Sequence, residues 1–320
     1  MTERRGTAVA IALLGAALAA AGCGLGPGAE VGSVELTVTR EFGSEAVLQR
    51  SLEAKESDTV MRGLEANADV ETRFGGGFVH SIDGVAEGEH GGDPYDWFFF
   101  VDGVESPVGA ADVELKADER VWWDYRDWSA TNHVPAVVGS WPAPFADGVA
   151  GKSYPVDLEC KGGGSACATA REALEREDVK LPSGSPEGAI RMLVGPWDHL
   201  RDDPAAQLLE DGPAESGIYA DFESIVRLSG DGARTETTAT PAYALVALRE
   251  DGEPGQLLGP EAGLVAATSR YGGPPVWLVT GGTAGAVREA AGALDAAHLR
   301  DHYAVAIEGG NETPLPEAGR

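Results

Sequence analysis

The chain has 320 residues, with 24 basic and 52 acidic side chains and a formal net charge of −28. A surface this acidic repels nucleic acid and anionic lipid headgroups. The composition therefore excludes a protein that binds nucleic acid or a membrane surface through a basic face. The acidic residues are scattered along the chain and form no tail, so solubility is the plain interpretation of the charge, and steering of a cationic ligand is the alternative.

The first residues are typical of an export signal. Two arginines precede an apolar run over about 8–21, which is too short to span a bilayer comfortably, and small residues follow as far as Cys23. The letters LAAAGC resemble the lipobox of bacterial lipoproteins, whose cysteine receives lipid after cleavage; an ordinary signal peptide is the alternative. We expect a lipoprotein signal peptide over 1–22, lipidation of Cys23, a tether over 23–32, and a lipid-anchored protein on the extracytoplasmic face of the cell membrane.

Cysteine parity points to one disulfide. The chain has three cysteines, so lipidation of Cys23 leaves Cys160 and Cys167 as a pair in an oxidising compartment. The segment ECKGGGSAC places three glycines between them, which is flexible enough for the sulfurs to meet. A metal site or a redox pair is the alternative, but there is no CxxC, and no histidine or further cysteine stands nearby.

A first unit is expected over 33–128. VELTVTREF alternates apolar and polar residues and predicts a strand, and SDTVMRGLEANA predicts a helix with Ser57 or Asp58 as its N-cap. More strands are predicted after the helix, separated by Gly, Pro and Asp turns: VETRF, GFVHSIDGV, DWFFFVDGV, VELKA and ERVWWDYRDW. One early helix among strands indicates an α+β fold, a sheet wrapped on a single helix.

GFVHSIDGV and the stretch from YDWFFFVDGV to VWWDYRDW resemble the transcobalamin C-terminal-like family of β-grasp domains. The matching elements are the aromatic strand with its (N/D)G turn, a short segment before an acidic turn, and a closing W-x-Y strand, here Trp97, Asp102–Gly103, Ala110–Ala111, Asp118–Glu119 and Trp123–Asp124–Tyr125. The family usually has a glycine in a DGD-like turn where this chain has Ala117–Asp118–Glu119. The resemblance implies a β-grasp fold and a cobalamin-like ligand, although the helical domain that completes the vitamin carriers' site is missing here.

Residues 129–150 read as a Pro-rich tail or linker that packs on the first unit, and 151–309 as a second unit of no recognised type. Strands and helices interleave in the second unit, which predicts an α+β sandwich. Its predicted strands are KSYPVDLEC, AIRMLVGP, GIYADF, PAYALVALRE, GLVAATS, PPVWLVT and YAVAIE. Its predicted helices are ACATAREALERE, HLRDDPAAQLLED and TAGAVREAAGALDAAHL. Residues 310–320 are expected to be a disordered C-terminus.

Large aromatic side chains gather in two short predicted strands of the first unit. One face of each strand must form the core over the helix, whereas a single helix cannot also bury the other face. Aromatic rings left exposed there could stack on a planar ligand, a sugar or a partner. The alternative is that the tail folds back over this face, with Trp141 and Phe145 filling the gap. The candidate ligand-binding residues are Trp97, Phe98, Phe100, Trp122, Asp124, Tyr125 and Trp128.

Signatures of catalysis are weak, so we expect no enzyme, no catalytic residue and no metal site. GxSxG and HExxH are absent, and TGGTAG is best explained as a strand-to-helix turn. DHLRDD, which holds His199 among carboxylates, is explained as a helix start capped by Asp198. His80, in the first unit, and His133, in the tail that follows it, stand singly and are taken as ordinary residues. Ligation of a metal centre in a cofactor is the alternative for each. An enzyme built on the second unit is the remaining alternative.

The sequence therefore predicts a surface-anchored lipoprotein that acts as a ligand-binding or transporter-accessory module. A corrinoid-like small molecule is the ligand that the resemblance suggests, and no other cofactor is expected. The expected partners are the membrane, through the N-terminal lipid, and a small ligand or a transporter component. The alternative is a structural or protein-interaction module of the cell envelope that has no small ligand.

Overall fold

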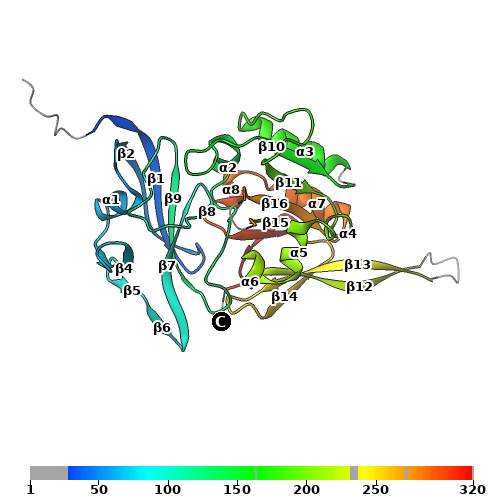
Figure 1. The fold of residues 1–320 in the computed structure, drawn as a ribbon. Coiled ribbons are helices and arrows are strands. Elements are labelled where there is room, and N and C mark those ends of the chain that lie inside the picture. Colours follow the sequence, from blue (N-terminus) through cyan, green and yellow to red (C-terminus); the bar gives the residue numbers. More distant parts are fainter. Residues whose placement is uncertain (1–27, 163, 231–236, 271–272, 319–320) are drawn as a thin grey trace, which may run out of the picture.

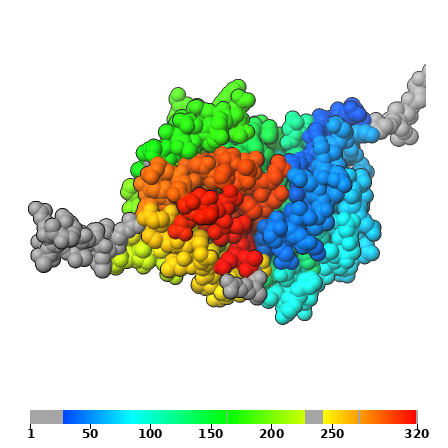
Figure 2. All heavy atoms as spheres, turned by 180° about the vertical axis from the view of Figure 1, so that it is seen from behind, coloured from blue at the N-terminus to red at the C-terminus, as the bar shows by residue number. Residues whose placement is uncertain are grey.

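The computed structural model describes residues 28–162, 164–230, 237–270 and 273–318. Two parts lie side by side and share one continuous body, as both views show (Figures 1 and 2). The predicted signal peptide and Cys23 lie outside the described residues. Within the described ranges, no helix is long and apolar enough to cross a membrane.

A six-stranded sheet forms the first part. Its order is β2-β1-β9-β7-β6, with β8 also paired to β7. β1 and β9 run parallel at the centre and the other pairs are antiparallel. The strands are β1 (Glu30–Arg40), β2 (Glu45–Lys55), β6 (Gly88–His90), β7 (Asp93–Val101), β8 (Val104–Glu105) and β9 (Arg120–Asp127).

One face of this sheet is covered by helix α1 (Val60–Glu65) and by a small sheet of β3 (Val70–Arg73), β4 (Phe78–Ile82) and β5 (Val85–Ala86). Val60, Met61 and Leu64 lie on one side of the helix and are buried. The N-cap is Thr59, whose hydroxyl accepts a hydrogen bond from the Arg62 amide at 3.3 Å. The predicted caps, Ser57 and Asp58, are therefore wrong.

Three expectations for this part need correction. VELKA is not a strand, because Glu114 makes only an isolated bridge with Thr59. β2 was not predicted, and β1 begins three residues inside the expected tether. In the turn Ala117–Asp118–Glu119, Asp118 adopts the left-handed conformation at φ +64°, which aspartate tolerates better than most residues do.

A second six-stranded sheet forms the other part, in the order β10-β11-β16-β15-β17-β18. β10, β11 and β16 are parallel, and the remaining pairs are antiparallel. Its strands are β10 (Val156–Cys160), β11 (Ile190–Val194), β15 (Gly263–Thr268), β16 (Val276–Gly281), β17 (Ala304–Glu308) and β18 (Asn311–Leu315). β18 falls where a disordered C-terminus was expected, so that expectation is wrong for 311–315.

Layers cover both faces of the second sheet. Helices α3 (Gly164–Arg176), α7 (Ala284–Gly292) and α8 (Ala296–Leu299) pack on one face. The other face carries α4 (Trp197–Leu200), α5 (Pro204–Glu210) and the base of a three-stranded sheet. That sheet is β12 (Ala220–Gly230), β13 (Thr237–Leu248) and β14 (Pro254–Gly259), preceded by α6 (Pro213–Ser216). β12 and β13 project from the body as a two-stranded arm (Figure 1).

Two helices that the sequence predicts as continuous are broken. Pro204 stands at the first turn of α5, where its missing N–H costs nothing, and Asp203 caps the helix by accepting a hydrogen bond from the Ala205 amide at 2.9 Å. The predicted cap Asp198 instead lies inside α4, whose N-cap position is Pro196. Asp295 caps α8 in the same way and separates it from α7.

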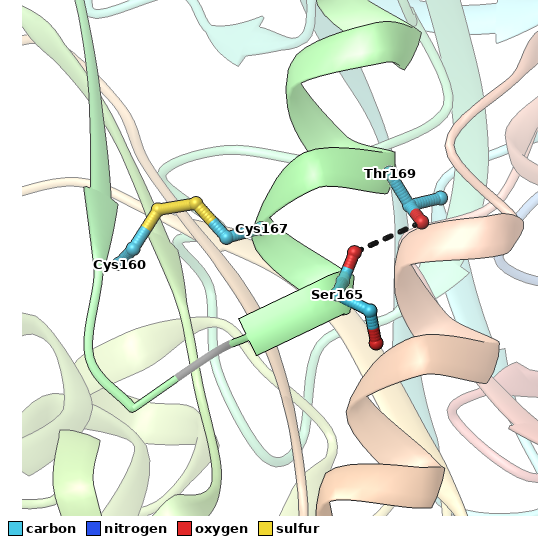
Figure 3. The surroundings of a disulfide bond; sticks show 4 residues. All are labelled: Cys160, Ser165, Cys167 and Thr169. Carbon is cyan, nitrogen blue, oxygen red and sulfur yellow. Dashed lines mark hydrogen bonds between the residues drawn. A yellow bond between two sulfur atoms is a disulfide. The ribbon is translucent and has the colours of Figure 1, made fainter.

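The predicted disulfide is confirmed. Cys160 at the end of β10 and Cys167 in α3 are bonded, with their Cα atoms 5.9 Å apart (Figure 3). The bond ties the first turns of the helix to the strand that precedes it. Sheets with few helices in both parts also confirm the α+β class.

Candidate functional site

The aromatic strands β7 and β9 pair antiparallel, with Phe99 opposite Trp123 and Phe100 opposite Trp122. Alternation sends the two pairs to opposite faces of the sheet. The rings of Phe99 and Trp123 stack at 4.7 Å in the core beneath α1. Tyr125 lies in the same core, and its hydroxyl donates to the Ala86 carbonyl at 2.8 Å.

The opposite face of these strands is sealed by the second part of the chain. Phe100 and Trp122 are both fully buried, and their rings lie 5.5 Å and 5.4 Å from the ring of Tyr303. The rest of this cluster comes from the β1–β2 turn, the tail, the residue just before β12, and β13: Phe42, Val134, Val137, Tyr219, Val246 and Leu248. The expectation that this face offers Phe100 and Trp122 to a ligand is therefore wrong, and they form an internal core between the two parts.

The tail covers this face only with its first half. Val134 and Val137 pack on the aromatic strands, as the covering alternative requires. Trp141 and Phe145, on either side of the start of α2 (Ala143–Ala146), go elsewhere. Their rings lie 5.6 Å and 5.0 Å from the ring of Trp277, within the core of the second part. The tail therefore joins the two cores.

A polar network centred on Asp124 lies in the same interface. The fully buried carboxylate accepts hydrogen bonds from the Thr39 hydroxyl at 2.6 Å, the Gly43 amide at 3.1 Å and the Tyr303 hydroxyl at 3.1 Å. The indole of Trp122 donates to the Thr39 hydroxyl at 2.7 Å. Burial raises the pKa of Asp124 to about 6. Asp124 thus holds the two parts together and does not face a ligand.

Ion pairs extend this interface at its edge. Arg120 of β9 pairs with Asp301 at 2.5 Å, and Arg300 pairs with Glu35 of β1. Gly43 has φ +87°, and a side chain there would collide with the Asp301 carbonyl, at 1.7 Å from the added Cβ. The two parts therefore meet in a close, specific contact.

The first part has a pocket at the other edge of β7, with a volume of about 170 Å³. One edge of β7 pairs with β9. On the other edge, β6 pairs with residues 93–95, β8 pairs with 100–101, and the Phe99 carbonyl accepts a hydrogen bond from the Ser106 amide at 3.3 Å, so 96–98 pair there with no strand of the described chain. The pocket lies along this gap, facing β4. It is lined by Met61, Gly77, Phe78, Val79, Asp96, Trp97, Phe98, Phe99, Glu105, Ser106, Gly109, Ala110 and Trp123.

Two carboxylates interrupt the apolar lining. Asp96 accepts a hydrogen bond from the Trp97 amide at 2.7 Å, and burial raises its pKa to about 6. Glu105 accepts from the Val134 amide at 2.6 Å and lies 3.3 Å from Nδ1 of His133. Hydrogen bonding to Glu105 raises the pKa of His133. Glu105 thus belongs to the pocket and also anchors the tail.

Exposed apolar side chains surround the pocket mouth. Phe78 lines the mouth and is 36% exposed, and its ring meets that of Phe74, which is 89% exposed, at 6.4 Å. Val108, adjacent to the lining residue Gly109, is 51% exposed. An apolar cavity of about 150 Å³ can admit a benzene-sized molecule. The pocket can therefore hold one ring-sized group of a ligand, with more apolar surface outside it.

The predicted site residues separate into four groups. Trp97 and Phe98 line the pocket, while Phe100, Trp122 and Asp124 are sealed in the interface and Tyr125 lies in the core. Trp128 follows β9, is 37% exposed and is not among the pocket residues. The sequence analysis missed Phe78, Asp96 and Glu105. An aspartate inside the aromatic run YDWFFF was the available signal for Asp96.

Metal ligands do not gather anywhere in the described residues: no group of three or more His, Cys, Asp and Glu side chains there could hold a metal ion. His80 lies 3.3 Å from a carboxylate oxygen of Glu87 and 3.1 Å from the Arg73 guanidinium. His80 therefore belongs to a surface cluster with Arg73 and Glu87, which explains its position without a ligand.

Residues 57–127 match the family described as "Domain of unknown function (DUF4430)". Every residue that lines the pocket between β4 and β7 lies within this DUF4430 segment. No curated protein matches the chain. Among solved structures, the chain is similar to a "putative metal binding protein" from Ruminococcus gnavus ATCC 29149, at 13% identity over 30% of this chain and 97% of that one, with a TM-score of 0.23.

Proposed function

We propose that this chain is a lipid-anchored binding protein of the extracytoplasmic membrane face, acting alone or as an accessory to a transporter. In this proposal the pocket between β4 and β7 receives the apolar group of a small ligand. The observation that carries it is the pocket itself: Trp97, Phe98 and Phe78 line an apolar cavity beside an unpaired strand edge, and exposed apolar side chains surround its mouth. The export signal and Cys23 supply the anchor.

The first ligand class to test is the corrinoids. Support for this comes only from the resemblance of the aromatic strands to transcobalamin-like domains. Because a volume of about 170 Å³ holds no more than a ring-sized group, a macrocycle would lie across Phe74, Phe78 and Val108 with one substituent inserted. Fold resemblance alone is weak support for a particular ligand, so the pocket and the corrinoid are tested separately.

A protein partner is the second candidate. The exposed fractions of Phe74 and Val108, 89% and 51%, favour it, because exposed apolar side chains gathered on one surface mark protein contact sites as well as ligand grooves. In that case the chain is a structural or protein-interaction module of the cell envelope, and the pocket accepts a side chain of the partner.

The experiment is a tryptophan-fluorescence titration of the soluble chain lacking residues 1–23 with cobalamin, cobinamide and a panel of small aromatic molecules, corrected for their absorbance. Trp97 and Trp123 line the pocket and serve as reporters. Phe78→Ala should weaken binding by about 1–3 kcal/mol, the magnitude of aromatic stacking on planar bases. Trp128→Ala is the matched control, since Trp128 is similarly exposed but lies outside the pocket.

The outcomes separate the claims. Saturable quenching by a corrinoid that Phe78→Ala weakens and Trp128→Ala does not would support both the pocket and the corrinoid. The same pattern with another molecule would support the pocket and reject the corrinoid. Equal effects of both variants would show that the ligand does not enter this pocket, and no response to any molecule would favour the protein partner.

A further inference from the structure

We propose that the second part of the chain carries a binding site of its own, which takes a small organic cation through the carboxylate of Asp157. This site is separate from the pocket between β4 and β7. It is a cavity of about 470 Å³, within the usual size range of small-molecule sites. Its lining residues are Asp157, Glu159, Ser185, Pro186, Gly188, Ala189, Arg191, Pro204, Ala205, Leu208, Thr268, Arg270, Gly273, Pro274 and Val276.

Strand alternation places Asp157 in this cavity. Its neighbour Val156 points into the core beneath α3 and α7. Asp157 therefore points to the opposite face of the sheet, where it is in register with Arg191 of β11, which is in turn in register with Val276 of β16. Helix α5 supplies the wall above them, with Ala205 and Leu208. The cavity thus lies between the sheet and α5.

Asp157 is 8% exposed, yet no residue that the structure describes forms a hydrogen bond or an ion pair with its side chain. Arg191, the nearest candidate by register, is committed elsewhere. Its Nε donates to Glu159 at 2.5 Å, and its Nη2 donates to Asp203 at 2.6 Å. Lys161 pairs with Glu159 at 3.5 Å. Arg191 and Lys161 therefore serve other carboxylates, and the charge of Asp157 faces the cavity. Arg270 also lines the cavity, but it forms no ion pair with Asp157 or with any other residue that the structure describes.

The carboxylate of Asp157 borders the cavity and has no protein partner, so a positive charge with hydrogen-bond donors placed in the cavity would stabilise it. A ligand with an ammonium group supplies both. The walls formed by Pro186, Leu208 and Val276 suit an apolar body behind that group. A metal ion fits poorly, because hard cations take six or more oxygen ligands and no group of His, Cys, Asp and Glu in the described ranges could hold one. A net charge of −28 also attracts cations to the protein.

The test is calorimetric titration of the soluble chain lacking residues 1–23 with 2-phenylethylamine, a charged probe, and with 2-phenylethanol, its neutral counterpart. The amine should bind about tenfold or more tightly than the alcohol, as expected for a charge-assisted hydrogen bond. Asp157→Asn should remove that preference and leave the weak binding of the alcohol unchanged. Asp198→Asn removes an exposed carboxylate outside the cavity and should change neither affinity.

Two further variants keep the test decisive. Leu208→Trp narrows the cavity from the α5 side and should weaken both probes, which tests the site even if Asp157→Asn does not fold. Phe78→Ala in the other pocket should leave the amine affinity unchanged, so failure of the proposed function and failure of this site are distinguishable. Equal binding of amine and alcohol to the wild-type chain, no binding of the amine at millimolar concentration, or unchanged amine binding in Asp157→Asn would each overturn the proposal.

Discussion

Replacement of Trp122 by alanine should destabilise the whole chain, because its indole sits where the two parts meet. The side chain is fully buried, its ring lies 5.4 Å from that of Tyr303, and its Nε1 donates to the Thr39 hydroxyl at 2.7 Å. The tail and β13 close the same cluster with Val137 and Val246. Removal of the indole therefore opens a cavity at the interface and deletes one donor from the network around Asp124.

The magnitude follows from the buried area. A tryptophan buries roughly 200 Å², which corresponds to about 5 kcal/mol at about 25 cal/mol per Å². An extended unfolded chain overstates that area, and measured losses for Trp→Ala in cores are about 3–5 kcal/mol. We expect a loss of about 4 kcal/mol in the free energy of unfolding. A ligand-stacking Trp122 on an open face would instead leave stability nearly unchanged.

Urea denaturation followed by circular dichroism measures the loss, with Trp128→Ala as the exposed control and Trp123→Ala as the core control. Trp128→Ala should cost less than about 1 kcal/mol, and Trp123→Ala, on the opposite face of the sheet, about 3–5 kcal/mol. If the two parts of the chain unfold separately in Trp122→Ala, its urea denaturation curve should also show two transitions where the wild type shows one. A loss below about 1 kcal/mol for Trp122→Ala would mean that the interface described here does not form in solution.

Three other predictions concern covalent chemistry and pH. Without reductant, Cys160 and Cys167 should resist alkylation, and replacing both by serine should cost about 2.5 kcal/mol for so short a loop. Free thiols on protein isolated from its native host would contradict the bond. Cys23→Ser should abolish labelling by a fatty-acid probe and leave the precursor uncleaved by the lipoprotein peptidase, whereas a soluble, cleaved and unlabelled wild type would refute the anchor. The pKa of Asp124 rises from 3.8 to about 6 on folding, so the folded chain binds more protons than the unfolded chain between these values. Stability should therefore fall by about 2 kcal/mol from this group as pH rises from 4 to 7, and Asp124→Asn should flatten that part of the pH profile, measured by urea titration; an unchanged slope would show that Asp124 does not titrate there.

Local signals were sufficient for most strands and helices of this chain. The apolar run PPVWLVT and the alternating segment VELTVTREF were both correctly predicted as strands. A continuous apolar run is typical of a strand buried on both faces, and alternation is typical of a strand buried on one face. β2 was missed because EAVLQRSLEAK, at the sheet edge, carries polar residues on both faces and so lacks alternation. Pro204 was an available signal for the break between α4 and α5.

Contacts between distant segments could not be predicted in the same way. Alternation along β7 and β9 sends Phe100 and Trp122 to the face away from α1, but nothing in their local sequence shows that Tyr303 covers them. The pocket beside β7 likewise depends on where β6 and β8 stop pairing, which is a property of register. Phe78 and Asp96 come together only once that register is known.

The sealed face between the parts has a practical consequence for anyone who divides this protein. A fragment that ends at residue 128 would present Phe100 and Trp122 to water, because Tyr303 and the tail residue Val137 would be gone. The DUF4430 segment of this chain is therefore not a self-sufficient fragment, although it contains every residue that lines the pocket at the edge of β7. Polar replacements on the sealed face, or retention of the whole chain, would be needed before the pocket could be studied without aggregation.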